Sequence, residues 1–80
     1  MDGYKIFLAS EVNPRDGMLV ELNSTDPVRQ IAEVFEDDET GVLSFTSFIT
    51  ESVPLQAIEE LVARALHEFP SRHLKNPDST

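Results

Sequence analysis

Five acidic side chains fall within seven residues near the middle of this chain. They are Glu33, Glu36, Asp37, Asp38 and Glu39. Carboxylates gathered on one turn attract the Arg and Lys side chains of a partner, and they form charge-assisted hydrogen bonds with them. The pattern therefore predicts a partner-binding turn that engages a basic protein surface.

The same acidic cluster has other interpretations. Acidic turns also serve simply to keep a small protein in solution. A calcium loop needs oxygen ligands at alternating positions, a glycine turn and a distal glutamate, and the run DDETG does not follow this spacing. Acid–base catalysis needs buried carboxylates whose pKa values are pushed apart, whereas these acids are expected to be exposed. We therefore expect neither a metal site nor a catalytic site in this segment.

Other residues that could carry chemistry are few. The chain has no cysteine, which excludes disulfides, thiolate metal sites and cysteine nucleophiles. His67 and His73 lack a third ligand at metal-binding spacing. The three glycines form no phosphate-binding loop, and no elbow motif marks a serine as a nucleophile. The sequence thus predicts a protein that is not an enzyme and that needs no cofactor.

The charge of the chain is strongly negative. Fifteen acids stand against six bases, for a net charge of -9. Residues 1–40 hold ten acids and three bases, or -7, and residues 41–80 hold five and three, or -2. Such a field repels phosphate backbones and anionic lipid and attracts basic proteins. The expected partner is a basic protein, such as a toxin, a nuclease or a nucleic-acid-binding complex, rather than a nucleic acid or a membrane.

We expect no export signal in the first residues of this sequence. Its first ten residues lack a basic leader followed by a long apolar stretch. No apolar run approaches the roughly 20 residues that are needed to span a bilayer. The expected location is therefore the cytoplasm.

Two β-strands are predicted in the first part of the chain. Residues 4–10 and residues 18–23 each alternate side chains with a period of two. Residues 11–17, which connect them, contain a proline and an Asp-Gly pair, and both favour a turn. The two strands are expected to form an antiparallel hairpin.

Residues 27–38 are compatible with two structures. As a helix, they would be capped by Asp26 and would give the element order ββαβα. As a strand from Gln30 to Glu36, they would form a hairpin with residues 42–48, with Gly41 in the left-handed position of the turn. We favour the hairpin, because the helix would end in four acids at the negative pole of its dipole. A strand at residues 42–48 also pairs most easily with an adjacent strand.

The most regular pattern lies near the end of the chain. Residues 53–69 predict an amphipathic helix with Pro54 in its first turn and Pro70 after its end. The expected apolar stripe comprises Leu55, Ile58, Leu61, Val62, Ala65, Leu66 and Phe69. Residues 71–80 are polar, and they predict a flexible tail that follows a single domain over residues 1–70.

These elements together predict an α+β fold. We expect a four-stranded antiparallel sheet, made of two hairpins, with one C-terminal amphipathic helix packed on one face. A single helix cannot cover Phe7, Leu19 and Phe48 at once. The other face of the sheet is therefore expected to be partly apolar.

The leading functional hypothesis is a small non-enzymatic inhibitor that docks on a basic partner. Small size, acidity and the lack of a catalytic motif match the physical profile of bacterial immunity proteins, phage counter-defence proteins and nucleic-acid mimics. The alternative is a structural or accessory subunit that homodimerises, or joins a complex, through the apolar sheet face or the edge strand. In that case the acids would provide only solubility.

Overall fold

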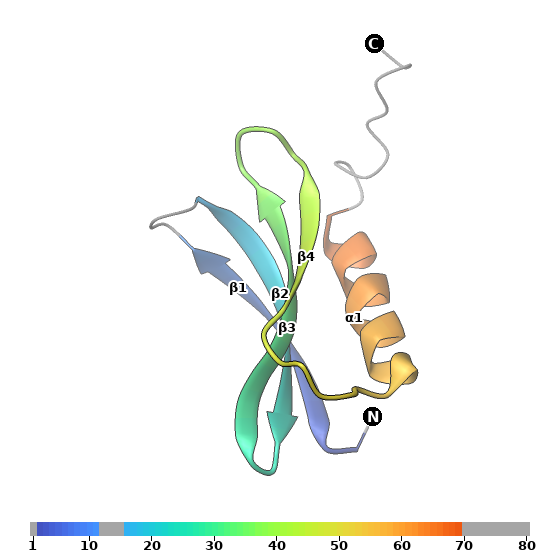
Figure 1. Cartoon of the computed structure of the whole chain (residues 1–80). Coiled ribbons are helices and arrows are strands. Elements are labelled where there is room, and N and C mark those ends of the chain that lie inside the picture. Colours follow the sequence, from blue (N-terminus) through green and yellow to red (C-terminus); the bar gives the residue numbers. More distant parts are fainter. Residues whose placement is uncertain (1, 12–15, 70–80) are drawn as a thin grey trace.

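The structure is a computed structural model that describes residues 2–11 and 16–69. The strands form one antiparallel sheet in the order β1-β2-β3-β4, and the helix lies across one side of it (Figure 1). This confirms the predicted α+β fold. The elements are β1 (Tyr4–Glu11), β2 (Gly17–Thr25), β3 (Val28–Asp37), β4 (Leu43–Ser47) and α1 (Leu55–Glu68).

Three of the predictions concern residues outside this described part. They are most of the predicted turn at residues 11–17, the position of Pro70, and the flexible tail at residues 71–80. These remain predictions.

Residues 27–38 form a strand in nearly their whole length, so the helical alternative is wrong. β3 pairs with β2 on one side and with β4 on the other, and Val34 lies opposite both Val20 and Phe45. Gly41 has a φ of 74°, as expected for the left-handed position of the turn. A strand suits this segment because six consecutive residues, 31–36, are all buried, which requires burial on two opposite faces.

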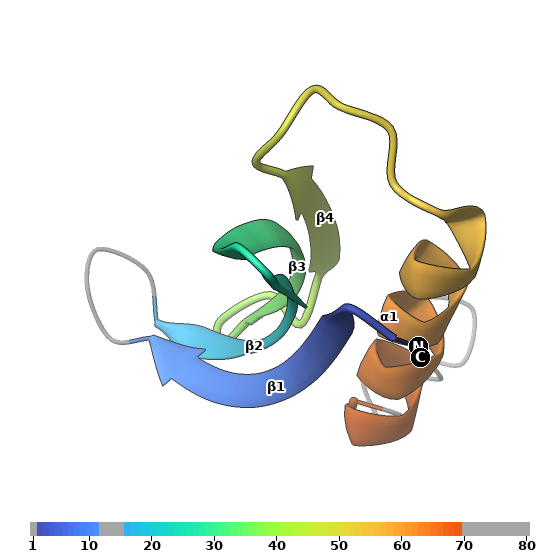
Figure 2. The same ribbon diagram turned by 90° about the horizontal axis from the view of Figure 1, so that it is seen from below.

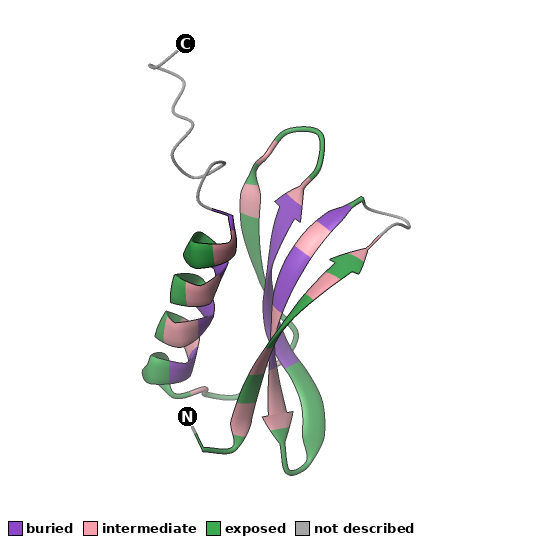
Figure 3. Ribbon diagram, turned by 180° about the vertical axis from the view of Figure 1, so that it is seen from behind, coloured by how far each residue is buried: buried purple, intermediate pink, exposed green. Residues whose placement is uncertain are grey.

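The hydrophobic core lies between α1 and one face of the sheet. Figure 3 shows buried residues along the inner side of α1 and along the middle strands. Alternate residues of β2 and β3 point toward the helix, because side chains in a strand alternate between faces. The core cluster comprises Val20, Leu22, Ile31, Ala32, Val34, Ala57, Leu61, Ala65 and Phe69.

The buried line of α1 is narrower than the predicted stripe. The helix begins two residues later than predicted and buries Ala57, Leu61 and Ala65. Two alanines, one turn before and one turn after Leu61, let the helix approach the sheet closely. The stripe prediction was therefore wrong for its outer flank, where Leu55 is 71% exposed and Val62 and Leu66 are also exposed.

The opposite face of the sheet has no helix on it. Seen from below, α1 lies to one side of the twisted sheet, and no described element covers the other side (Figure 2). Phe7 and Phe48 are about half-exposed, while Leu19 is buried. Phe7 and Phe48 are thus left exposed as expected, whereas Leu19 is buried although it lies on the open face. This open face carries the candidate site.

Candidate functional site

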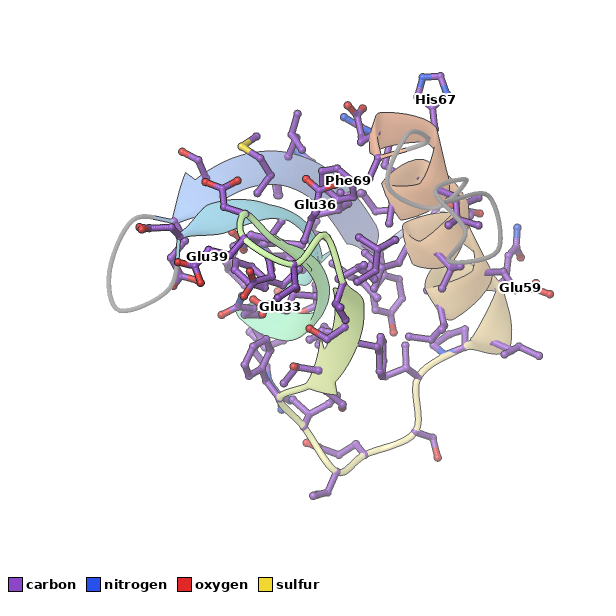
Figure 4. All side chains as sticks on the ribbon, turned by 90° about the horizontal axis from the view of Figure 1, so that it is seen from above. Glu33, Glu36, Glu39, Glu59, His67 and Phe69 are labelled. Carbon is purple, nitrogen blue, oxygen red and sulfur yellow. The ribbon has the colours of Figure 1, made fainter. Side chains whose placement is uncertain are left out.

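The five acids that were predicted to bind a partner do not form a single surface. Glu33 is 2% exposed and Glu36 is 7% exposed, so the expectation of exposure was wrong for both. They are three residues apart in β3 and therefore point to opposite faces of the sheet. Figure 4 shows Glu33, Glu36 and Glu39 at separate places around β3. Asp38 and Glu39 are exposed in the turn, as predicted.

Asp37 has a structural role in the turn between β3 and β4. Its Oδ1 accepts hydrogen bonds from the backbone N–H groups of Glu39, at 2.8 Å, and Thr40, at 3.0 Å. The N–H of Gly41 also donates to the carbonyl of Asp37. The backbone N–H groups of Thr40 and then Glu39 hold the pKa of the Asp37 carboxyl below its usual value. Asp37 thus shapes the turn that presents Asp38 and Glu39.

A groove of about 390 Å³ lies on the open face of the sheet. Side chains from three adjacent strands form it, and Phe48, just after β4, adds an aromatic wall. No basic side chain is among the residues found to line it, although three glutamates are. The lining residues are Ala9, Ser10, Glu11, Leu19, Glu21, Gln30, Glu33 and Phe48.

The register of the strands places two carboxylates face to face in this groove. Glu21 of β2 lies directly opposite Glu33 of β3. Phe7 of β1 flanks the pair on one side and Thr46 of β4 on the other. Like charges at directly opposed positions destabilise a sheet. This row therefore gathers negative charge on the open face, outside the core cluster under α1.

A second hollow of about 290 Å³ continues along the open face. Phe7 and Asn23 line it, together with Lys5 and the end of the β2–β3 hairpin. The Oδ1 atom of Asn23 is buried and accepts no hydrogen bond in the described structure. Asn23 lies two residues from Glu21 in β2, on the same face, at a spacing of about 7 Å. The open face therefore carries a row of hydrogen-bond acceptors, from Glu33 and Glu21 to Asn23, with the rings of Phe7 and Phe48 beside it.

Comparisons of this chain with protein-family models, with curated proteins and with solved structures found no match. Within residues 2–11 and 16–69, no group of three or more His, Cys, Asp or Glu side chains is arranged to hold a metal ion. The described part of the chain also contains no helix that is both long enough and apolar enough to cross a membrane.

Two glutamates of the groove were missed by sequence reasoning. Glu11 and Glu21 were not among the predicted site residues, because neither belongs to the dense acidic run. A signal was present for Glu21, which shares the period-two face of Leu19 and Asn23. The position of Glu33 opposite Glu21 depends on the register between β2 and β3, and that register includes a shift between Leu22 and Asn23.

Proposed function

We propose that this protein is a non-enzymatic binding protein that docks on a basic protein surface through the groove on its open sheet face. The observation that carries this proposal is the opposed pair Glu21 and Glu33. A cationic side chain of a partner that approaches this row would be attracted by both carboxylates.

The groove favours arginine over lysine as the side chain it receives. Leu19 is an apolar lining residue, and the half-exposed rings of Phe7 and Phe48 border the glutamates. A guanidinium group stacks on an aromatic ring and donates to a carboxylate in the same geometry, whereas an ammonium group is a compact, strongly hydrated charge. The partner we propose is therefore a protein with a projecting arginine on a basic surface.

The charge of the whole chain supports the same partner. A net charge of -9 speeds the encounter with a basic surface, and Asp38 and Glu39 add to this field from the exposed turn. In this proposal the acidic turn speeds the approach of the partner, and the groove forms the contacts that keep it bound. Inhibition of a toxin, a nuclease or a nucleic-acid-binding complex is the specific form we propose, because such targets present arginine-rich surfaces. The immunity and counter-defence roles both belong to this form.

A titration with a short, fluorescently labelled arginine-rich peptide tests the groove. The double variant Glu21→Gln, Glu33→Gln should weaken binding by about tenfold or more, because close ion pairs contribute more than 1 kcal/mol to affinity. The matched control, Asp38→Asn with Glu39→Gln, removes the same charge from the turn. It should weaken binding less, and mainly at low salt.

Two further measurements complete the experiment. Circular dichroism should show that both double variants keep the fold. The corresponding lysine peptide should bind more weakly than the arginine peptide to the unmodified protein. Equal weakening by the groove variant and the turn variant would mean that net charge alone drives binding, and the groove would not be the site.

A further inference from the structure

The outer edge of β4 is unusually unprotected for a sheet edge. β4 has the sequence LSFTS, with no charged residue and no proline. Natural edge strands are commonly blunted by charges, prolines or bulges, because their free N–H and C=O groups otherwise pair with another chain. The opposite edge strand, β1, carries Lys5 and Glu11. In a chain of net charge -9, a neutral edge lets two copies approach with less repulsion than a charged edge would.

Hydrogen bonds at the two ends of β4 show which of its backbone groups face outward. The N–H of Phe48 donates to the carbonyl of Ile31 at 2.8 Å, and the carbonyl of Val42 accepts from the N–H of Asp37 at 3.1 Å. Backbone groups alternate in direction along an antiparallel strand, so the even-numbered residues of β4 bond to β3. The residues whose backbone N–H and C=O groups point away from β3 are therefore Leu43, Phe45 and Ser47.

Apolar side chains border this edge on the helix side of the sheet. Phe45 lies on that face, opposite Val34, and is 52% exposed. In Figure 4, His67 projects from α1 on the side of β1. The spacing of a right-handed helix places Val62 and Leu66 on the other flank of α1, which turns toward β4. Both are exposed, so apolar side chains of α1 face the same side of the molecule as this edge.

We infer that β4 pairs antiparallel with β4 of a second copy of this chain, forming a continuous eight-stranded sheet. The outward groups are centred on Phe45, so a two-fold axis there matches each N–H with a carbonyl of the other copy. Leu43 of one copy lies opposite Ser47 of the other. This axis is perpendicular to the sheet, so both helices lie on the same face, with their exposed apolar flanks toward each other.

A second copy fits this edge better than a basic partner does. A basic partner would be drawn to carboxylates, and β4 offers none. The opposed glutamates of the groove lie on the other face of the sheet, on β2 and β3, so the pairing leaves the proposed docking groove open. Homodimerisation and groove binding therefore use different surfaces of the chain, and an experiment can disprove either proposal without affecting the other.

Analytical ultracentrifugation over the micromolar concentration range tests the pairing. We expect a monomer–dimer equilibrium that tightens as salt is added, because salt screens the repulsion between two chains of the same charge. Groove binding to a basic peptide should instead weaken with salt. Phe45→Lys should raise the dissociation constant of the dimer by about tenfold or more, because it places two like charges opposite each other.

The matched control is Leu8→Lys on the other edge strand. Leu8 lies on the helix side of the sheet, as Phe45 does, and is 41% exposed, and its replacement should leave the dimer intact. Amide exchange of the unmodified protein gives a second readout, in which the N–H of Phe45 should become protected as the dimer forms. A chain that stays monomeric at every concentration and salt would overturn the inference, as would a dimer that Phe45→Lys leaves unchanged.

Discussion

The two faces of the sheet are built by alternate residues of the same strands, yet they differ in composition. On the helix side, Leu22 lies opposite Ala32 and Val20 opposite Val34, and α1 covers these pairs. On the open side, the neighbouring row brings Glu21 opposite Glu33. The helix side thus consists of paired apolar side chains, whereas the open side carries a pair of opposed carboxylates.

This difference shows how an 80-residue chain can combine a stable fold with a binding surface. A domain of this size has a small core, and most of its buried apolar side chains lie under α1, although Leu19 and Phe35 are buried on the open side. The open face is then available for side chains that would be costly in a core. Locally unfavourable arrangements of this kind are typical of functional sites. Variants on the helix side should therefore lower stability, whereas variants of the groove glutamates on the open side should weaken binding.

The largest effect is expected from Leu61→Ala on the helix side. Leu61 is fully buried, so the change leaves a cavity and should lower the free energy of unfolding by about 2–5 kcal/mol. Urea denaturation at a concentration where the chain is monomeric measures this. Leu55→Ala makes the same chemical change in the same helix at an exposed position, and should cost less than about 0.5 kcal/mol. Equal effects would mean that α1 does not hold the sheet as described.

A smaller loss is expected from Gly17→Ala, at the start of β2. A Cβ atom there would collide with the carbonyl oxygen of Glu36 and lie 2.8 Å from the Phe35 ring. Gly17 does not have a positive φ, so the cost is steric and should be about 1–3 kcal/mol. Phe35 is buried on the open face without a helix above it. The variant therefore tests whether close backbone packing supports that face.

Gly3→Ala provides the contrast, again by urea denaturation. An added Cβ at Gly3 meets no atom within 4 Å, but the residue has a φ of 85°. Its cost should be about 1–2 kcal/mol and should come from backbone strain alone. If Gly17→Ala unfolds at the same urea concentration as the unmodified protein, the packing described for Phe35 is not present.

Much of the fold could be predicted from the sequence because its signals are local. Period-two alternation identified β1 and β2, and helical spacing identified α1. The choice between strand and helix for β3 depended on the acidic run that a helix would have placed at its negative pole. The start of α1 and its exact buried line were not predicted, because the expected apolar stripe included Leu55 and Val62 and left out Ala57.

The candidate site was harder to predict because it depends on contacts between strands. The density of acids directed attention to the turn, where Asp38 and Glu39 are indeed exposed. The opposition of Glu21 and Glu33 is set by the pairing of β2 with β3, and a one-residue slip would have moved Glu33 to the other face. The burial of Glu33 likewise has no local signal, since most glutamates are exposed.

The smallest effect is expected from Glu21→Gln, and this variant tests most directly whether the two faces have different roles. Glu21→Gln removes one of two opposed negative charges and keeps the size of the side chain. We expect the free energy of unfolding to rise by about 0.2–1 kcal/mol, because like charges at opposed positions destabilise a sheet. Urea denaturation at low salt measures this, and the gain should shrink as salt is added.

The same variant should bind the arginine-rich peptide more weakly than the unmodified protein does. A gain in stability together with a loss of binding is the signature of a residue retained for function. The matched control is Glu59→Gln, on the exposed side of α1, where Figure 4 shows the side chain pointing away from the sheet. It removes the same charge and should change neither quantity appreciably. If Glu21→Gln instead destabilises the fold, Glu21 supports the sheet, and the open face would not be the costly surface inferred from its register.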